Sequence, residues 1–528
     1  MGGNLVNPFS SDSHLRDSLW NSRKGLYPTV GALRKSGTSV ITEDICVNNT
    51  DLPFAVQELH QIFRSWEYDD AVVFGHAKDG NLHFVSSIDF NDKDGIKKFD
   101  GMIKDLVSMT IGKFNGSLKA EHGTGRNMAP FVETEWGGEL VEVMWKIKSL
   151  ADPNHILNPG VLLNRNTNTH LENLKQMPPV SETVDLCVEC GFCEPVCPSR
   201  DLTLTPRQRI VVNREMMLSE FTQSAMDELQ NDFGYDGNQT CATDGLCALE
   251  CPVNIDTGVF IKEQRRTQHS LFSEILANII ARNFAVTQSL IKVGLKSGSL
   301  IGNSILEKIT SGLRRYGLKK IPQWNSYLTG AAKINLYSSG EGEELIYFPS
   351  CVHRSFGANK ESIINMMMDI APQLGLKLII PKLIHSLCCG MPFSSKGYQK
   401  AHLIMIDKTA NELYTLSNCG QIPILLDMSP CSNQIRNEKG HEKLTALKFV
   451  DIIELLYNKR HNFDQYEKLN REVLIHHTCS TQKMHHEDKF MAVMEKITDK
   501  IIIQETNGCC ATAGDKGLFI PELTDSAG

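Results

Sequence analysis

Four closely spaced cysteines constrain this chain of 528 residues more than any other feature. They are Cys187, Cys190, Cys193 and Cys197, in the run C-V-E-C-G-F-C-E-P-V-C-P. This spacing is typical of a loop that holds a [4Fe–4S] cluster, with the fourth cysteine often serving a second cluster. A disulfide knot or a zinc ribbon is the alternative, but structural zinc sites usually pair two separate C-x2-C knuckles. The run therefore predicts an iron–sulfur protein that transfers electrons.

A second group of cysteines repeats this spacing, with Asp244 in the place of one cysteine. In two-cluster ferredoxins the fourth cysteine of one group ligates the cluster of the other group. By that rule the ligands of one [4Fe–4S] cluster are Cys187, Cys190, Cys193 and Cys251. The ligands of the second cluster are Cys197, Cys241 and Cys247, with Asp244 or water on the fourth iron. An oxygen ligand makes that iron labile, so we expect a [3Fe–4S] form of this centre.

The composition narrows the classes of function. A net charge of −8 argues against a nucleic-acid partner, because phosphate binding needs a basic surface. The polar start of the chain predicts no signal peptide, and no run of about 18 apolar residues predicts a transmembrane helix. Sixteen clustered cysteines favour metal ligation in a reducing compartment over disulfides, so we expect a cytoplasmic protein.

Changes of composition along the chain predict a multidomain α+β protein. The expected segments are a mixed α/β part at 1–165, a polar linker at 166–183, the cysteine groups at 184–262, amphipathic helices at 263–340 and two strand-rich, repeated units at 341–528. Within them, strands are expected at 71–74 and 82–85, and helices at 138–150 and 205–232.

The helical segment 263–340 is basic, with amphipathic helices expected over 271–280 and 289–318. Its cations are Lys292, Lys296, Lys308, Arg314, Arg315, Lys319 and Lys320. The pattern favours a helical layer with a solvated cationic face. A helix lying on the inner face of the cytoplasmic membrane, as in a peripheral membrane protein, is the alternative.

Three histidines and a glutamate form another chemical signature. His76 and His83 flank Asp79-Gly80, a hairpin signal that brings the two rings together. With Glu121 they have the composition of a divalent-metal site with an open position. Adjacent side chains of an extended segment point in opposite directions, so we expect Glu121 and His122 to serve metal and substrate separately. Histidines that only bond a buried loop are the alternative.

The chain here resembles the C-terminal, substrate-binding domain of FAD-linked oxidases of the vanillyl-alcohol-oxidase type. Three motifs carry the resemblance over about residues 15–165: G-H-x-x-D-G-N-L-H, A-E-H-G-T-G and D-P-N-H-I-L-N-P-G. The branch it resembles most is that of the D-2-hydroxyacid dehydrogenases. This family carries its FAD-binding domain before such a segment. We therefore expect either a chain truncated at its N-terminus or a flavin domain on a separate polypeptide.

The resemblance implies roles for particular residues. The residues that would bind a divalent ion, such as zinc or manganese, are His76, His83 and Glu121. His122 would be the general base. Arg23, in the stretch L-W-x-x-R, would clamp the substrate carboxylate, although an exposed helix arginine fits the pattern equally well. The segment at Asn158 would lie against the flavin, and Gly123 and Gly125 would leave space for a flat ligand.

Two cysteine signatures stand near the C-terminus, each a single cysteine followed by a vicinal pair. They are Cys351 with Cys388 and Cys389, and Cys479 with Cys509 and Cys510. They resemble the CCG repeats of heterodisulfide-reductase-type subunits, which implies an α/β cysteine-rich domain with an additional iron–sulfur centre or redox-active thiols. Ala511 stands where a glycine is usual in such repeats. The chain ends soon after this motif, so we expect a C-terminal truncation and an incomplete second repeat. Cys431 is a further candidate ligand, whereas Cys46 and Cys419 are expected to be ordinary buried thiols.

The order of these segments predicts a fused path for electrons, from a D-2-hydroxyacid through FAD and iron–sulfur clusters to a quinone or cytochrome. The insert between the cysteine groups resembles the ferredoxin module of anaerobic glycerol-3-phosphate, glycolate and succinate oxidoreductases. The resemblance favours an FAD-dependent D-lactate dehydrogenase that forms pyruvate, with D-2-hydroxyglutarate and glycolate as alternatives. Thr42-Glu43 stand where relatives acting on larger acids carry a lysine, which disfavours a second carboxylate. The rival class is a non-catalytic iron–sulfur subunit of a flavoprotein complex.

Overall fold

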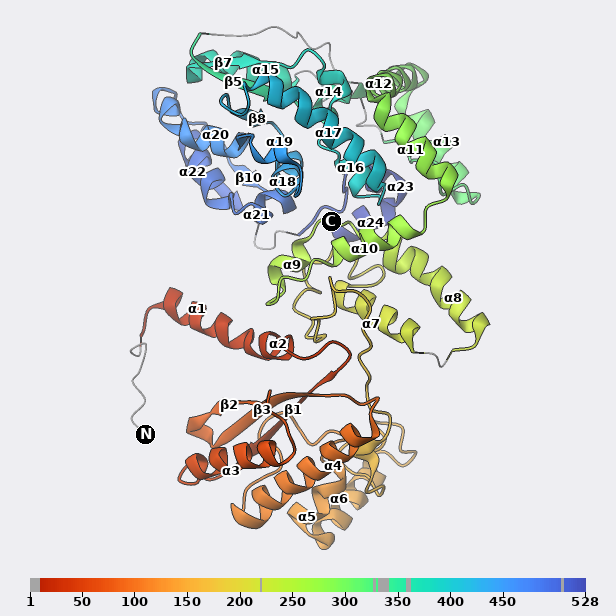
Figure 1. Ribbon diagram of the computed structural model, residues 1–528, viewed down its shortest axis with the longest axis vertical. Coiled ribbons are helices and arrows are strands. Elements are labelled where there is room, and N and C mark those ends of the chain that lie inside the picture. The colour runs from red at the N-terminus through yellow and green to blue at the C-terminus, as the bar shows by residue number, and fades with distance from the viewer. Residues whose placement is uncertain (1–9, 219–220, 326–328, 331–340, 358–361, 505–507) are drawn as a thin grey trace. The chain divides into compact units, whose positions relative to one another are not determined.

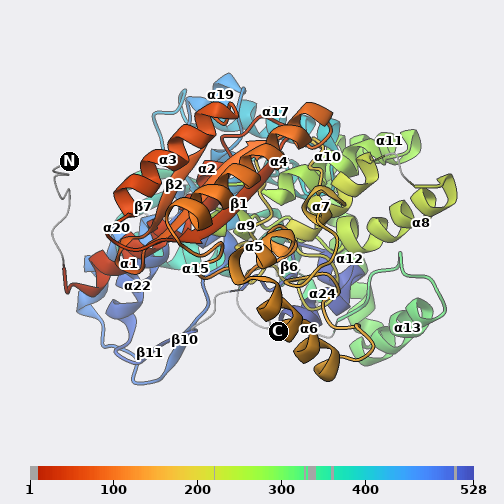
Figure 2. The same ribbon diagram turned by 90° about the horizontal axis from the view of Figure 1, so that it is seen from below.

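The computed structural model of the chain describes residues 10–218, 221–325, 329–330, 341–357, 362–504 and 508–528 (Figures 1 and 2). The chain forms two compact units. The first consists of Met1–Gly191 with Ile210–Phe221, and the second of Phe192–Arg209 with Thr222–Gly528. Expectations for residues 1–9, 219–220 and 331–340 lie outside the described residues.

A three-stranded antiparallel sheet organises the first unit. Its strands are β1 (Ser39–Cys46), β2 (Val72–His76) and β3 (Asn81–Ile88), in the order β1-β3-β2. Two helices, α3 (Leu52–Ser65) and α4 (Lys93–Val107), cover one face of this sheet (Figures 1 and 2). The helical spacing of Leu59 and Phe63 puts both side chains on the same side of α3, where they pack against Phe84. Burial of this apolar face stabilises the unit.

The opposite face of the sheet collects polar side chains. Successive residues of a strand alternate between faces, so Leu82 and Phe84 enter the core while His83 points away from it. The register places His83 between Asp44 of β1 and Phe74 of β2. The hairpin expected at Asp79-Gly80 is present, with a 3-10 turn over Ala77–Asp79 and Gly80 at φ 65°.

The first unit also contains helices that flank the sheet and follow it. They are α1 (Ser13–Lys24), α2 (Leu26–Gly31), α5 (Val132–Trp136) and α6 (Gly138–Ala151). The last of these matches the helix predicted over 138–150. Asp152 ends α6 and accepts hydrogen bonds from the N–H groups of Ile156 and Leu157 at 3.0 and 2.9 Å. This carboxylate folds the following segment back on the helix.

A four-stranded parallel sheet organises residues 343–451 of the second unit. Its strands are β5 (Glu343–Phe348), β7 (Leu376–Ile379), β8 (Ile424–Leu426) and β9 (Phe449–Asp451), in the order β7-β5-β8-β9. Helices α15 (Ile363–Ile370), α17 (Gln399–Leu416), α18 (Ser429–Arg436) and α20 (Ile452–Asn458) connect or follow them. Because the strands are parallel, their carboxyl ends meet at one edge, and the residues that follow them gather there.

A smaller version of this arrangement follows. Strands β10 (Val473–Ile475) and β11 (Ile501–Ile503) are parallel. A cysteine opens a short helix after the first strand of each pair, in α14 (Cys351–Ser355) and α21 (Cys479–Lys483), and Ser350 and Thr478 cap these helices. Both arrangements therefore share a strand followed by a capped helix that begins with a cysteine, and the internal repeat stays a prediction. The expectation of strand-rich units is wrong, because helices take up more of the described part of 341–528 than strands do.

The helical segments differ from their predicted limits. The helix expected over 205–232 is two helices, α7 (Pro206–Met217) and α8 (Gln223–Phe233), and Thr222 caps the second. The basic segment forms α11 (Leu271–Arg282), α12 (Phe284–Ile301) and α13 (Asn303–Arg315), separated by Asn283 and Gly302. Among the helices of the described residues, none has the length and apolar character that a membrane span needs.

The remaining elements of the second unit are short. The helices are α9 (Leu246–Glu250), α10 (Thr257–Thr267), α16 (Met391–Ser394), α19 (Glu442–Thr445), α22 (Glu487–Ile497), α23 (Lys516–Phe519) and α24 (Pro521–Ala527). Strand β4 (Thr329–Gly330) pairs with β6 (Phe356–Gly357).

Gly75 on β2 provides a test of how tightly the hairpin is packed. A Cβ at this position would come within 2.1 Å of the Asn81 carbonyl oxygen on β3, and backbone cannot rotate away as a side chain can. We expect Gly75→Ala to lower the free energy of unfolding by about 1–3 kcal/mol. Thermal unfolding followed by circular dichroism measures the change. Gly112→Ala is the control, since its Cβ would meet nothing within 4 Å; equal losses in both variants would contradict this account.

Candidate functional site

Glu121 bridges two histidines on the polar face of the first sheet. Its Oε1 lies 3.1 Å from Nε2 of His76 and 2.8 Å from Nε2 of His83. The ligand atoms of these three residues lie within 4.8 Å of one another. Both ring nitrogens of His83 are buried without a partner in hydrogen-bond geometry among the residues that the structure describes. A divalent ion would satisfy these atoms, so the donor set fits a metal site.

The charges in this cluster favour the protonation states that a metal ligand needs. Burial lowers the pKa of His83, and the neighbouring His122 lowers it further. Burial opposes ionisation of Glu121, but His76, His83 and His122 together bring the pKa of this carboxyl below its ordinary value. A neutral imidazole and an ionised carboxylate are both ready to bind a cation.

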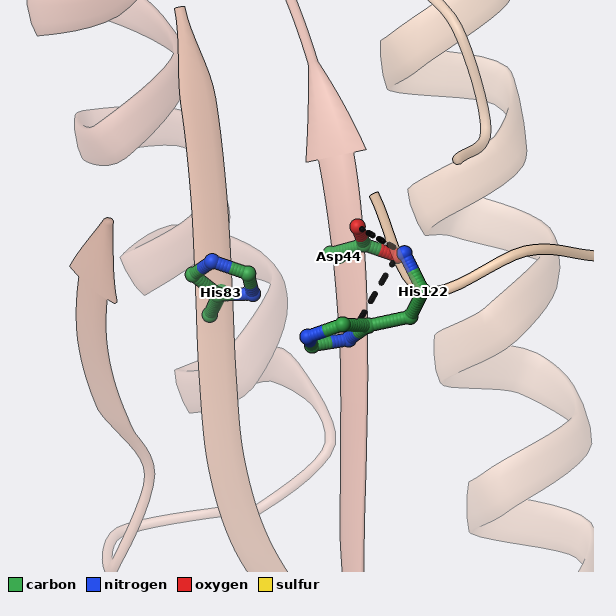
Figure 3. A group of neighbouring side chains, drawn as sticks. All are labelled: Asp44, His83 and His122. Carbon is green, nitrogen blue, oxygen red and sulfur yellow. Dashed lines mark hydrogen bonds and ion pairs between the residues drawn. The ribbon is translucent and has the colours of Figure 1, made fainter. Parts of the chain in front are cut away.

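Asp44 is fully buried and lies beside His122 (Figure 3). It holds the loop that carries both Glu121 and His122. Its Oδ2 accepts hydrogen bonds from the backbone N–H groups of Ala120, Glu121 and His122, at 3.2, 2.6 and 3.1 Å. Burial alone would raise the pKa of Asp44, but the N–H groups of Glu121 and His122, with the Lys119 ammonium, lower it. The other carboxylate oxygen lies 3.8 Å from Nδ1 of His122. One buried carboxylate therefore positions both functional side chains of the loop.

Glu121 and His122 converge, so the expectation that they point in opposite directions is wrong. The His122 ring centroid is 4.7 Å from that of His83, and its Nε2 lies 3.9 Å from Oε1 of Glu121. The reason is local: these residues form a bend rather than an extended strand, because Asp44 gathers their N–H groups. Asp44, His83 and His122 form a second set of donor atoms within 4.8 Å, sharing His83 with the first (Figure 3).

Arg23 of α1 also reaches this cluster. Its Nη2 lies 2.5 Å from Nε2 of His76, and its guanidinium lies 5.0 Å from the centroid of the Trp20 ring. The sequence left a carboxylate clamp and a free surface arginine equally open. The structure puts the guanidinium beside a candidate metal ligand, where its planar fork can bind a carboxylate in two hydrogen bonds.

The loop after His122 is joined to the segment around Asn158. Gly123 and Gly125 have φ values of 75° and 60°, a conformation that favours glycine. The N–H of Leu162 donates to the carbonyl of Gly125 at 3.1 Å, which ties the two segments together. A Cβ on either glycine would meet nothing within 4 Å. Asn158 is exposed beside this open space, so the three residues suit a flat cofactor that approaches the backbone.

Two buried arginines hold the first cysteine loop within the first unit. Arg34 donates to the carbonyls of Asp185 and Cys187 at 2.7 and 3.0 Å. Arg214 donates to the Cys187 carbonyl at 2.9 Å and pairs with Glu189 at 2.6 Å. Cys187 and Cys190 belong to the first compact unit, and Cys193 and Cys251 to the second, so their shared cluster stays a prediction.

Another buried arginine lies among thiols of the second unit. Arg209 is only 1% exposed and donates to Sγ of Cys197 at 3.7 Å. Burial disfavours its charge, but the thiols of Cys241, Cys197 and Cys247 raise its pKa. A permanent cation at this place would balance the negative thiolates of a cluster. Sequence reasoning missed Arg209, because an arginine in a polar helical segment looks like a surface residue.

Four thiols gather at the carboxyl edge of the parallel sheet. Sγ of Cys351, after β5, lies 3.6 Å from Sγ of Cys388, and Sγ of Cys389 lies 3.2 Å from Sγ of Cys431, after β8. The buried Arg354 donates to the carbonyls of Pro349 and Leu387 beside them. This set fits a thiolate-bound centre or a pair of redox-active thiols, and it includes Cys431, the additional candidate.

The second set of paired cysteines meets Asp244. Its carboxyl is hydrogen-bonded to the Cys509 thiol, and Cys509 is in turn hydrogen-bonded to Cys479 and Cys510. Oδ2 of Asp244 is buried without a hydrogen-bond partner among the described residues. Burial, then Asp256 and Asp244, raise the pKa of Cys247. Asp244 therefore lies between the second ferredoxin-like group and the second cysteine pair, and can serve either as an oxygen ligand.

Three smaller expectations concern isolated positions. Cys46 and Cys419 were expected to be buried, but Cys46 is half-buried at the end of β1 and Cys419 is exposed after α17. Ala511 adopts φ 55°, a strained conformation for a residue other than glycine, in agreement with the glycine that the repeat pattern favours there.

Comparison with known proteins supports two of the expected segments. Residues 1–162 match the family of FAD linked oxidases, C-terminal domain, and residues 183–255 match the 4Fe-4S dicluster domain. The first match contains the histidine–glutamate cluster, and the second contains both ferredoxin-like cysteine groups. The chain thus combines an FAD-oxidase C-terminal domain with an iron–sulfur domain in a mixed α/β protein.

Individual relatives match about a quarter to a third of the chain. The glycolate oxidase subunit GlcD of Bacillus subtilis is 31% identical over 25% of this chain and 27% of its own length. A probable mitochondrial D-lactate dehydrogenase of Danio rerio is 29% identical over 29% and 31%. The D-2-hydroxyglutarate dehydrogenase of Stutzerimonas stutzeri is 32% identical over 27% and 30%. The chain therefore spans less than a third of the length of these relatives.

Replacing Asp44 tests whether its carboxylate organises the metal site. Asn has the same shape but no negative charge, and an amide oxygen accepts three N–H groups less well. We expect Asp44→Asn to weaken Zn²⁺ or Mn²⁺ binding by about 10–100-fold, measured by titration calorimetry. Asp152→Asn is a matched control, since Asp152 also accepts two backbone N–H groups but lies outside the cluster. Equal metal affinity in the two variants would remove Asp44 from this role.

The thiols should differ in reactivity. A hydrogen bond with Cys509 lowers the pKa of the exposed Cys510 to about 5. Hydrogen bonds with Thr512 also lower this pKa, whereas burial raises it. A hydrogen bond with Cys388 lowers the pKa of Cys389, but the hydrogen bond with Cys431 and burial together hold this pKa well above its ordinary value. We expect iodoacetamide to modify Cys510 first in the metal-free chain, at a rate that no longer rises above about pH 6. Peptide mass spectrometry measures this order, and equally fast alkylation of Cys389 would contradict it.

Proposed function

We propose that the chain takes part in the FAD-dependent oxidation of a D-2-hydroxyacid, with D-lactate, which gives pyruvate, as the favoured substrate. The observation that carries the proposal is the convergence of five side chains on one sheet face: Arg23, His76, His83, Glu121 and His122. The match of residues 1–162 to the FAD linked oxidases supports it.

Oxidation of a hydroxyacid removes a proton from the hydroxyl and a hydride from C2. His122 is half-exposed beside the candidate metal ligands, where its imidazole can accept the hydroxyl proton. The Arg23 guanidinium can bind the carboxylate of the acid. His76, His83 and Glu121 would hold a divalent ion, which would supply polarisation of the hydroxyl, and FAD would supply the hydride acceptor. Asp44 keeps His122 and Glu121 in a fixed relation during the reaction.

The strand positions next to the cluster favour a small acid. The register places Thr42 of β1, Val85 of β3 and Val72 of β2 in one row on the face of Asp44 and His83. None of these three side chains carries a positive charge that could pair with a second carboxylate. This row supports D-lactate or glycolate over D-2-hydroxyglutarate.

We propose that the electrons continue through two iron–sulfur clusters and the paired cysteines to a quinone or cytochrome. The repeated arrangement of strand, capped helix and second strand supports two CCG units, each with an additional iron–sulfur centre. Asp244 offers a point of contact between the second ferredoxin-like cysteine group and the second CCG unit, which contains Cys479, Cys509 and Cys510. Electrons would flow from the hydroxyacid toward the clusters, because the hydroxyacid is the hydride donor.

A non-catalytic iron–sulfur subunit of a flavoprotein complex is the second candidate. It is favoured by one observation: residues 183–255 match the 4Fe-4S dicluster domain, and such a domain transfers electrons without binding a substrate itself. In this case a separate polypeptide would supply the flavin, and the histidine–glutamate cluster would complete its active site.

A panel of D-2-hydroxyacids distinguishes the two candidates. The protein at its full natural length is loaded anaerobically with iron, sulfide and a divalent metal, and assayed with FAD and an artificial acceptor. We expect a bound flavin band and fastest acceptor reduction with D-lactate. Iron–sulfur absorption without a flavin band, and no turnover of any acid, would overturn the dehydrogenase proposal and favour the subunit.

Within the same assay, His122→Ala should lower the rate about 10²–10⁴-fold, because the hydroxyl proton loses its acceptor. Metal content and the cluster spectrum should stay unchanged. His60→Ala, at an exposed position of α3, is the matched control. Unchanged activity of His122→Ala would remove His122 from the mechanism.

A further inference from the structure

Helix α11 turns its large apolar side chains outward. The outward residues are Leu271, Phe272, Ile275, Leu276 and Ile279, and the first two are 85% and 76% exposed. Their spacing puts them on one stripe of the helix. The small residues Ala277 and Ala281 face inward, toward α17. This is the reverse of an ordinary surface helix, which buries its large apolar residues and exposes its small and polar ones.

The next two helices also expose large apolar residues, although α12 buries Phe284 and Leu295 as well. The outward apolar residues of α12 are Val286, Leu290, Val293 and Leu300, and those of α13 are Ile305, Ile309 and Leu313, followed by the exposed Tyr316 just after the helix. Both sets recur at helical spacing, so each forms a stripe. On α13 no residue is buried at all. The stripes of α11, α12 and α13 are together called the outer apolar surface below.

The helices that carry the outer apolar surface are neighbours in the fold. α11 packs against α12, and α12 against α13, and the three helices lie together on one flank of the second unit (Figure 1). Soluble monomers rarely expose a contiguous apolar patch of more than a few hundred Å² unless the patch binds something. The outer apolar surface therefore calls for an occupant.

Cations surround this surface, although the chain as a whole is acidic. Residues 271–320 contain eight Lys and Arg against two Glu, a net charge of +6, whereas the whole chain carries −8. The exposed cations are Arg282, Lys296, Lys308, Arg315, Lys319 and Lys320. In the described part of the chain, none of these six makes an ion pair with an acidic side chain. Their charge is thus available to an outside partner.

We propose that the outer apolar surface binds the face of an anionic lipid membrane, with α11–α13 lying in the plane of the interface. Amphipathic helices with large apolar residues on one side and flanking Lys and Arg bind membranes in this way. A second copy of the chain is a poorer occupant, because it would bring the same cations face to face. The sequence favoured a solvated cationic layer; the outward position of the aliphatic side chains reverses that preference.

This inference stands on the helices alone and does not depend on hydroxyacid oxidation. It would place the paired-cysteine end of the electron path near lipid, where membrane-soluble acceptors are found. The chemistry that recognises the surface is a negatively charged headgroup over an acyl interior. Neither a neutral bilayer nor a soluble polyanion offers both.

Vesicle co-sedimentation of the iron-loaded chain tests the proposal. We expect at least about tenfold stronger binding to vesicles of phosphatidylglycerol and phosphatidylcholine than to phosphatidylcholine alone, and weaker binding at high salt. Equal binding to both vesicles, or none to either, overturns the proposal. Light scattering, run in parallel, tests whether a second copy of the chain binds this surface instead. A dimer that does not bind vesicles, and that the surface variants described next abolish, would also overturn the proposal.

Variants separate the apolar and the charged contributions. A variant without the apolar contribution combines Leu271→Ser, Ile275→Ser and Ile279→Ser, and we expect it to bind vesicles at least about tenfold more weakly. A variant without the charged contribution combines Lys296→Gln, Lys308→Gln and Arg315→Gln, and we expect it to lose the preference for anionic lipid. The matched apolar control is Leu140→Ser, Val143→Ser and Ile147→Ser on α6, which are also exposed. The matched charge control is Lys93→Gln, Lys97→Gln and Lys146→Gln. Circular dichroism and the cluster spectrum verify folding, and equal effects of test and control sets overturn the proposal.

Discussion

Buried guanidinium groups hold the cysteine-bearing loops of this chain. Irregular loops present backbone carbonyls that must find donors, and one arginine fork satisfies several of them. Arg34 and Arg214 do so around Cys187, and Arg354 does so beside Cys351 and Cys388. Arg209 reaches the Cys197 thiol itself. The same cations offset the negative charge of neighbouring thiolates, so loop order and thiol chemistry depend on one type of interaction.

The elements that follow strict local rules could be predicted from the sequence. The hairpin at Asp79-Gly80 formed where a turn dipeptide separates two apolar runs, and it brought His76 to His83. The amphipathic pattern of 138–150 gave α6 within one residue of its limits. The cysteine spacings pointed to an iron–sulfur domain, which the match of residues 183–255 supports. In each case the signal lies within a few residues of the feature.

Long-range and inverted features could not be read in this way. The bend at Glu121 and His122 depends on Asp44, whose partners no local pattern reveals. Arg209 looked like a surface residue until the fold enclosed it. The stripes of α11–α13 have helical periodicity, and periodicity cannot tell which side of a helix faces the core. On α11 the small residues Ala277 and Ala281 face inward, whereas the pattern alone suggested an ordinary helical layer.

The hydrogen bonds of Asp44 also bear on how the first unit folds. They join β1 to residues that follow 76 to 78 positions later, with α3, β2, β3 and α4 between them. Such distant partners meet only after the intervening chain has folded, since closing a long disordered loop costs entropy before any contact repays it. We therefore expect the metal ligands and the candidate base to come together late in folding. A chain that binds a metal tightly at this cluster is therefore one in which the whole unit has completed its fold.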